Sequence, residues 1–177
     1  MNFEIIEDCF PDYLIKTNIT NENDIITIYF HSNRNENNCP SCNTASTDVT
    51  TYFHRIIQDL PIINKALFLN IRLKKFRCNN SKCSTKVFSE TIDELAFAKK
   101  RRTNRLNKKL TAFALTTSAE GAAKLLKSHH NINVSGDTLL RLAKSVTFEI
   151  NKNEIDAIGI DDFALKKNID MELFSST

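Results

Sequence analysis

The sequence has no apolar run near the roughly 18 residues that a membrane-spanning helix needs. It has only three glycines, and its 41% hydrophobic and 25% charged residues exclude a collagen-like or wholly disordered chain. A secretory signal is also lacking, because the first residues are acidic where such a signal is basic and then apolar: Glu4, Glu7, Asp8 and Asp12. We therefore expect a cytoplasmic protein without a membrane partner, in which 177 residues form one ordinary domain or two small ones.

A large net charge is lacking as well, but the value of +3 hides a segregation of charge along the chain. Residues 1–38 have a net charge of −5, and residues 150–177 have one of −3. Between them, residues 72–109 contain thirteen basic and three acidic side chains, a local excess of +10. Such an excess attracts polyanions, although a solvated lysine-rich surface has the same composition.

Four of the five cysteines form two short pairs: Cys39, Cys42, Cys78 and Cys83. Paired spacings of this kind in a cytosolic chain favour four thiolates around a structural zinc ion over disulfides. Cys9 is interpreted as a small buried residue or a free thiol. His54 is the alternative ligand, although an ordinary surface or packed histidine is the simpler interpretation.

The residues around the cysteines have the alternation of short strands. Residues 65–77 place apolar side chains at every second position, which predicts a half-buried strand that ends at Cys78. Residues 51–60, ended by Pro61, and residues 86–90 are the other predicted strands, and residues 24–31 are expected to pair with the same small sheet. Such a sheet has little core, so a zinc ribbon stabilised by its metal is expected.

From about residue 93 the apolar period changes to that of helices. Helices are predicted over 98–118, over 119 to about 129 with Ser118 as its cap, and from Ser135 to about 148. This is the pattern of a helix-turn-helix domain, whose last helix enters the major groove, although any small helical bundle has a similar period. We expect DNA contacts from basic and hydroxyl side chains: Arg101, Arg102, Arg105, Lys108, Ser135, Thr138, Arg141 and Lys144.

Several motifs follow one another along the chain: Cys39-Pro-Ser-Cys42, His54, Asp59-Leu-Pro61, Lys75-Phe-Arg-Cys78, Cys83, Phe88-Ser-Glu90, Arg102-Thr103, Val134 to Arg141, and Ile158 to Lys167. Together these motifs resemble insertion-sequence transposases of the ISL-three family. The resemblance covers residues 39–167, with a weaker match upstream of them. It implies an α+β chain: an N-terminal β segment (1–36), a zinc ribbon (37–92), a helix-turn-helix domain (96–150) and the first strand of a ribonuclease-H-like DDE domain (155–177).

The resemblance also bears on catalysis. DDE transposases bring together three carboxylates that hold two Mg²⁺ ions for DNA cleavage and strand transfer. Asp161 matches the first of these carboxylates, and Asp162 is the neighbouring alternative. The match fails beyond Lys167, so we expect an inactive, C-terminally truncated transposase copy, with Mg²⁺ bound only in a full-length relative.

Two functions are compatible with these observations. The first is a transposase-derived protein that binds the terminal inverted repeats of an insertion sequence as double-stranded DNA. Such a protein would bind those ends without cutting them, alone, as a homo-oligomer or with full-length transposase. The second is a zinc ribbon that binds another protein and does not bind DNA.

Overall fold

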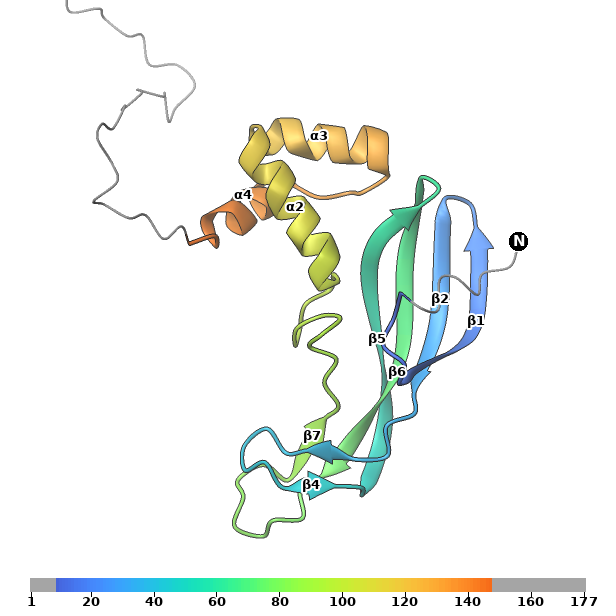
Figure 1. Cartoon of the computed structure of the whole chain (residues 1–177), viewed down its shortest axis with the longest axis vertical. Coiled ribbons are helices and arrows are strands. Elements are labelled where there is room, and N and C mark those ends of the chain that lie inside the picture. The colour runs from blue at the N-terminus through green and yellow to red at the C-terminus, as the bar shows by residue number, and fades with distance from the viewer. Residues whose placement is uncertain (1–8, 148–177) are drawn as a thin grey trace, which may run out of the picture. The chain divides into compact units, whose positions relative to one another are not determined.

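The computed structural model describes residues 9–147 of the chain. Its main sheet has the strand order β1-β2-β6-β5, and β7 also pairs with β6 (Figure 1). β2 and β6 are parallel, and the other strand pairs of this sheet are antiparallel. The strands are β1 (Leu14–Glu22), β2 (Ile25–Ser32), β5 (Val49–Ile62), β6 (Lys65–Arg77) and β7 (Val87–Ser89). Two further short strands, β3 (Asn37–Asn38) and β4 (Ala45–Ser46), pair with each other.

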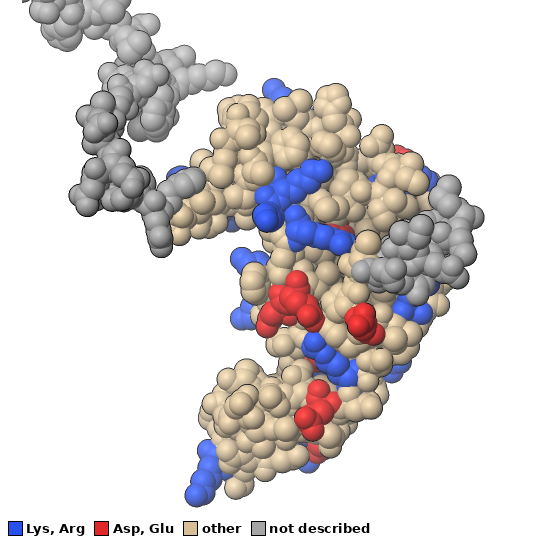
Figure 2. Space-filling view, viewed as in Figure 1, with Lys and Arg blue, Asp and Glu red and all other residues tan. Residues whose placement is uncertain are grey.

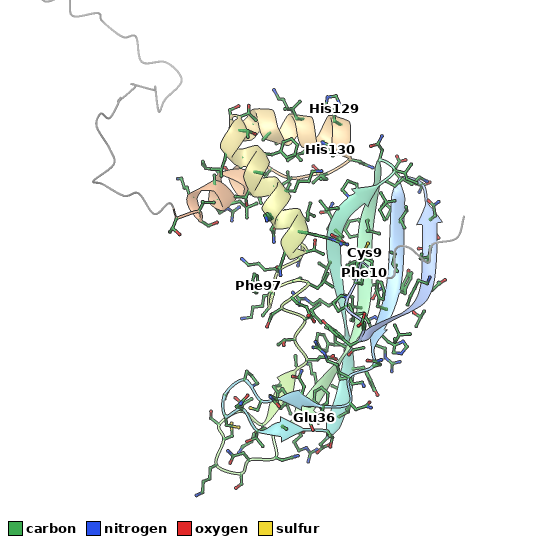
Figure 3. All side chains as sticks on the ribbon, in the orientation of Figure 1. Cys9, Phe10, Glu36, Phe97, His129 and His130 are labelled. Carbon is green, nitrogen blue, oxygen red and sulfur yellow. The ribbon has the colours of Figure 1, made fainter. Side chains whose placement is uncertain are left out.

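One face of the main sheet packs on a continuous apolar core. It contains Ile28 of β2, Ile57 of β5 and alternate residues of β6, all almost fully buried. Phe10 covers this face from the N-terminal side and lies 5.0 Å from Phe30 between ring centroids (Figure 3). The expectation that the sheet has little core was therefore wrong, because β1 and β2 extend the sheet and residues 92–96 help to cover it.

The opposite face of β2, β5 and β6 remains partly or fully exposed, because side chains alternate across a sheet. We call it the open face. It consists of Thr27, Tyr29, His31, Tyr52, His54, Ile56, Gln58, Phe68, Asn70, Arg72 and Lys74.

The hairpin of β5 and β6 turns at Ile63 and Asn64, which both have positive φ, of 50° and 58°. Two such residues match the right-handed twist of the strands that they join. The predicted strand end at Pro61 is corrected: β5 continues to Ile62, and Pro61 lies within a shift of the strand register, where its missing N–H is tolerated.

Three helices follow and share a second apolar core that includes Leu106, Leu110, Leu126 and Leu139. They are α2 (Asn104–Thr116), α3 (Ala119–His130) and α4 (Gly136–Lys144). The predicted caps at Ser118 and Ser135 are confirmed, since each hydroxyl accepts a hydrogen bond from a backbone N–H of the first turn. Of these helices, none is long and apolar enough to cross a membrane.

The first helix begins later than predicted. Thr103 is its cap, and the residues before it pair with the sheet instead: Gln58 N–H donates to the Arg101 carbonyl, and Thr103 N–H to the Gln58 carbonyl. These bonds fix Arg101 and Arg102 in an extended segment beside β5. The last helix also differs, because α4 ends at Lys144 instead of near 148.

Candidate metal centre and its surroundings

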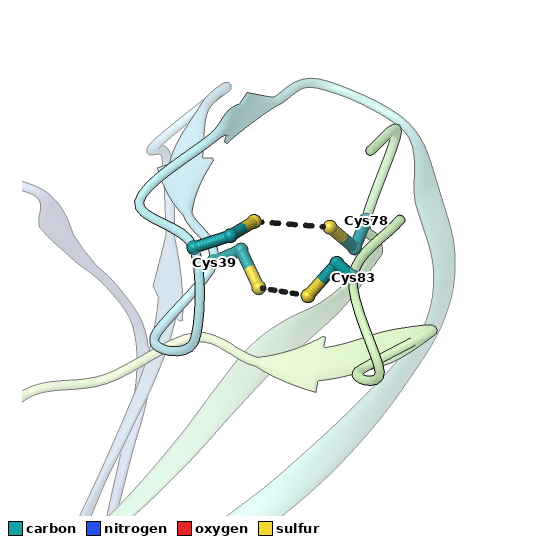
Figure 4. Close-up of side chains that lie close together, drawn as sticks. Cys39, Cys78 and Cys83 are labelled. Atoms are coloured by element: carbon teal, nitrogen blue, oxygen red, sulfur yellow. Dashed lines mark hydrogen bonds between the residues drawn. The ribbon is translucent and has the colours of Figure 1, made fainter. Parts of the chain in front are cut away.

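The four paired cysteines converge at the end of the β5–β6 hairpin away from its turn (Figure 4). Cys39 Sγ lies 3.9 Å from Cys83 Sγ, and Cys42 Sγ lies 3.6 Å from Cys78 Sγ. All four sulfur atoms lie within 4.8 Å of one another. Tetrahedral zinc with Zn–S bonds of about 2.3 Å needs sulfurs about 3.8 Å apart, so the cluster has the size of a zinc site.

Tight backbone turns present the sulfur atoms. In the first pair, Asn43 N–H donates to the Cys39 carbonyl, and Asn43 has the positive φ of 56° that such a turn requires. In the second pair, Cys83 N–H donates to the Asn80 carbonyl. Cys39, Cys78 and Cys83 are buried, with the Phe76 and Phe88 rings packed beneath them. Each pair is thus held in place before a metal arrives.

The thiols differ in acidity. Hydrogen bonds with the hydroxyl and the backbone N–H of Thr44 lower the pKa of Cys42 to about 6. A backbone hydrogen bond from Asn80 lowers the pKa of Cys78, but burial and the neighbouring thiols outweigh it and raise this pKa to about 12. A backbone hydrogen bond from Thr85 lowers the pKa of Cys83, but burial and hydrogen bonds with Cys42 and Cys39 outweigh it and raise this pKa. Metal binding therefore has to release protons from some of these thiols.

The other candidate ligands lie elsewhere. Cys9 is exposed and lies outside the cluster, and its carbonyl accepts a hydrogen bond from Arg105. His54 is on the open face, where its Nδ1 lies 2.9 Å from Asn70 Oδ1. His129 and His130 form the last turn of α3 (Figure 3), and the His130 ring packs against Phe113. Within the described residues, the four cysteines are the cluster suited to a metal.

A comparison with protein families assigns this region. Residues 36–83 match the family described as the zinc-finger of transposase IS204/IS1001/IS1096/IS1165. This match supports a transposase-related protein. The match and the sulfur geometry together support a structural zinc ion at the four cysteines. No curated protein and no solved structure matches the chain.

A second cluster, which the sequence analysis did not predict, joins the main sheet to the helices. Asp59 of β5 is fully buried, and its carboxylate accepts hydrogen bonds from the Thr103 hydroxyl at 2.7 Å and from Leu60 N–H at 2.8 Å. Arg105 of α2 completes the cluster with an ion pair, in which its Nε lies 2.8 Å from Asp59 Oδ1. These hydrogen bonds raise the pKa of Arg105 further above its usual value. Arg105 is thus paired with an internal carboxylate while 38% of its side chain stays exposed, and a DNA contact was predicted for it.

Glu90 is a second buried carboxylate, and it links β2 to β6. It is buried, and its carboxylate accepts hydrogen bonds from the Ser32 hydroxyl and from the backbone N–H of Lys74 at 3.1 Å. Asp59 lies in β5 and Glu90 directly follows β7; both stand in motifs quoted for the family resemblance, but their burial was not predicted.

The other predicted DNA contacts lie on different elements. Lys108 is exposed on α2, whereas Arg141 and Lys144 are exposed on α4. Ser135 is the α4 cap, and Thr138 Oγ1 lies 3.0 Å from its hydroxyl. Arg101 is exposed and Arg102 is half-buried beside β5.

The predicted catalytic Asp161 and the predicted domain start at 155–177 lie outside the described residues. The associated Mg²⁺ site is likewise untested by the described structure.

Proposed function

We propose that this protein is a transposase-derived DNA-binding protein that recognises the terminal inverted repeats of an insertion sequence. The observation that carries the proposal is the four-cysteine centre inside a segment that matches a transposase zinc-finger family. In this proposal the zinc module and the three helices form the DNA-recognition half of a transposase, and the partner is double-stranded DNA.

The helices supply the part that would read the DNA sequence. α3 and α4 are joined by residues 131–135, and α4 packs against both α2 and α3. This order of helices is compatible with a helix-turn-helix, with α4 as the helix that enters the major groove. Its exposed Arg141 suits a guanine edge, because a guanidinium donates two parallel hydrogen bonds to O6 and N7.

Basic side chains supply the affinity for phosphates. Lys108 and Lys109 are exposed on α2, and Lys144 is exposed at the end of α4. Because Arg105 is paired with buried Asp59, it is not part of the proposed surface. Phosphate contacts of this kind fix the orientation of the protein on the duplex, and base contacts set its sequence preference.

The test is a selection of duplexes from a random pool, followed by affinity measurements on the selected sequence at several salt concentrations. The logarithm of the affinity should fall against the logarithm of the salt concentration with a slope of about −0.9 for each phosphate contact. Arg141→Ala should weaken binding to the selected duplex roughly tenfold or more and relax the preference at one base pair.

Arg141→Lys is the matched control, because it keeps the charge and removes the paired hydrogen bonds. It should relax the sequence preference with a smaller loss of affinity on unrelated duplexes. The selected duplex should also match the ends of an insertion sequence. Absence of binding to any duplex at low salt contradicts the proposal and favours a zinc module that binds protein.

A further inference from the structure

The open face of the main sheet combines aromatic and basic side chains. Tyr52 is 49% exposed, and its ring lies under the Arg72 guanidinium, with 4.1 Å from Cζ to the ring centroid. Tyr29 and Phe68 present partly exposed rings on the same face, from β2 and β6. None of the open-face residues is acidic, whereas on the covered face acidic and basic side chains lie near one another (Figure 2).

Two hollows lie on the open face. The first, of about 530 Å³, includes Tyr52, Arg72 and Lys74 in its lining. The second, of about 700 Å³, is lined by Phe68 and its neighbours on β5, together with Arg101 and Arg102. The cross-strand pairs His54–Arg72 and Gln58–Phe68 place residues of the two hollows on the same two strands. Aromatic and cationic groups therefore follow the hairpin over several residues.

This combination suits one class of ligand. Basic side chains alone would bind any phosphate backbone. Exposed aromatic rings add to the affinity only where the faces of the bases are free to stack on them. In a duplex these faces are stacked on neighbouring bases, whereas in a single strand they are available to aromatic side chains. The three rings of the open face lie on neighbouring strands, with Phe68 of β6 between Tyr29 of β2 and Tyr52 of β5, so a single strand that crosses these β-strands can meet all three.

We propose that the open face is a binding site for single-stranded DNA. Tyr29, Tyr52 and Phe68 stack on bases, and Arg72, Lys74 and Arg101 contact the phosphates. The β5 and β6 residues of this site lie within the segment that matches the transposase zinc-finger family. The choice of DNA over RNA thus rests on the proposed function, but the site is distinct from the duplex contacts proposed for α4.

The experiment uses the full zinc-loaded chain and a fluorescent oligothymidylate, with binding followed by fluorescence anisotropy. Tyr52→Ala should lower the affinity roughly tenfold, the loss of about one stacked base. Tyr52→Phe should retain near wild-type affinity, because the ring is kept. Arg72→Gln should reduce the salt dependence by about 0.7 in the log–log slope, as expected for one lost contact with a single strand.

Phe97→Ala is the matched control, since Phe97 is a 57% exposed aromatic residue away from the open face. Phe97 is labelled in Figure 3, and its backbone carbonyl accepts a hydrogen bond from Arg55, which alternates in β5 with the open-face residues His54 and Ile56. This variant should bind oligothymidylate as the wild type does. Zinc content and the thermal unfolding midpoint of every variant show whether its fold is intact.

Competition separates the alternatives. Unlabelled oligothymidylate should displace the fluorescent oligothymidylate better than oligouridylate does. Tyr52→Ala should leave the affinity for duplex DNA unchanged. Arg141→Ala should weaken duplex binding only. Single-strand binding without duplex binding supports this site and contradicts the role of α4; duplex binding alone contradicts this site. An intact Tyr52→Ala variant with unchanged oligothymidylate affinity, or tighter binding of oligouridylate, overturns the inference.

Discussion

At the turn end of the β5–β6 hairpin, side chains pack into a continuous apolar core, whereas at the other end four thiols replace most of that core. Ile57, Leu69 and Ile71 belong to the first region and are fully buried. The cysteine end has few apolar groups, chiefly the stacked rings of Phe76 and Phe88. Burial of apolar surface thus stabilises this pair of strands at one end, and a zinc ion bound by the four cysteines would stabilise it at the other.

This difference indicates which part of the fold depends on zinc for its stability. In a small zinc ribbon, metal binding and folding are one event, because little else stabilises the fold. Here the sheet has its own core, and the helices are attached to it by the Asp59–Arg105 ion pair. Loss of zinc is therefore expected to be a local event at the cysteine end.

The largest expected effect comes from removing the metal. Cys78→Ser should abolish stoichiometric zinc binding and so remove on the order of 10 kcal/mol of binding free energy. Hydrogen exchange should then become fast at the amides of Cys39 and Cys83, while the amides of Leu69 and Ile71 remain protected. Treatment of the wild type with a chelator should give the same local pattern.

Cys9→Ser is the control for this change, because Cys9 lies outside the cluster. It should retain zinc and wild-type exchange. Fast hydrogen exchange at the Leu69 amide in the metal-free protein would mean that the two ends of the hairpin fold as one unit. This result would contradict the expected difference between them.

The next largest effect concerns the junction between the sheet and the helices. Arg105→Ala leaves the buried Asp59 carboxylate without its charge partner, which costs about 3 kcal/mol or more of folding stability. Chemical denaturation measures this loss. Arg101→Ala, at an exposed position of the same basic run, should change the stability by less than about 0.5 kcal/mol. Equal effects of the two substitutions would show that the ion pair has no special role.

A third prediction concerns pH and acts only at the cysteine end. Zinc needs thiolates, and in the metal-free state the raised pKa of Cys78, about 12, keeps this thiol protonated at neutral pH. Zinc affinity should therefore rise with pH, by about tenfold per unit for each proton released. Below about pH 6 the dependence should steepen, because Cys42 then also binds a proton. Competition with a chromophoric chelator at several pH values measures this, and a flat profile would contradict it.

The smallest effect is expected at the turn end. Ile63 is 74% exposed and holds a positive φ that is costly for a β-branched side chain. Ile63→Asn should raise stability by about 0.5 to 1 kcal/mol, since asparagine adopts this conformation readily. The same substitution at Ile56, an exposed residue in the middle of β5, should lower stability slightly. Thermal unfolding of both variants compares the two positions.

Much of the local structure was predictable from sequence. Alternation identified β6, and the serine caps located the starts of α3 and α4. β1 was missed as a separate strand, because its sequence is mostly polar and only a few of its side chains face the core. The start of α2 was misplaced, because basic residues before Thr103 continue a helical pattern while their backbone pairs with Gln58.

The sequence by itself determined the candidate metal ligands, because each pair of cysteines is joined by a short turn whose spacing is a local property. It also determined the basic excess in residues 72–109. Only the tertiary structure decided how those charges are used: Arg105 is paired with Asp59, whereas Arg72 lies on the open face over Tyr52. Strand pairing between distant segments decides which charges face a carboxylate and which face solvent, and no local pattern contains that information.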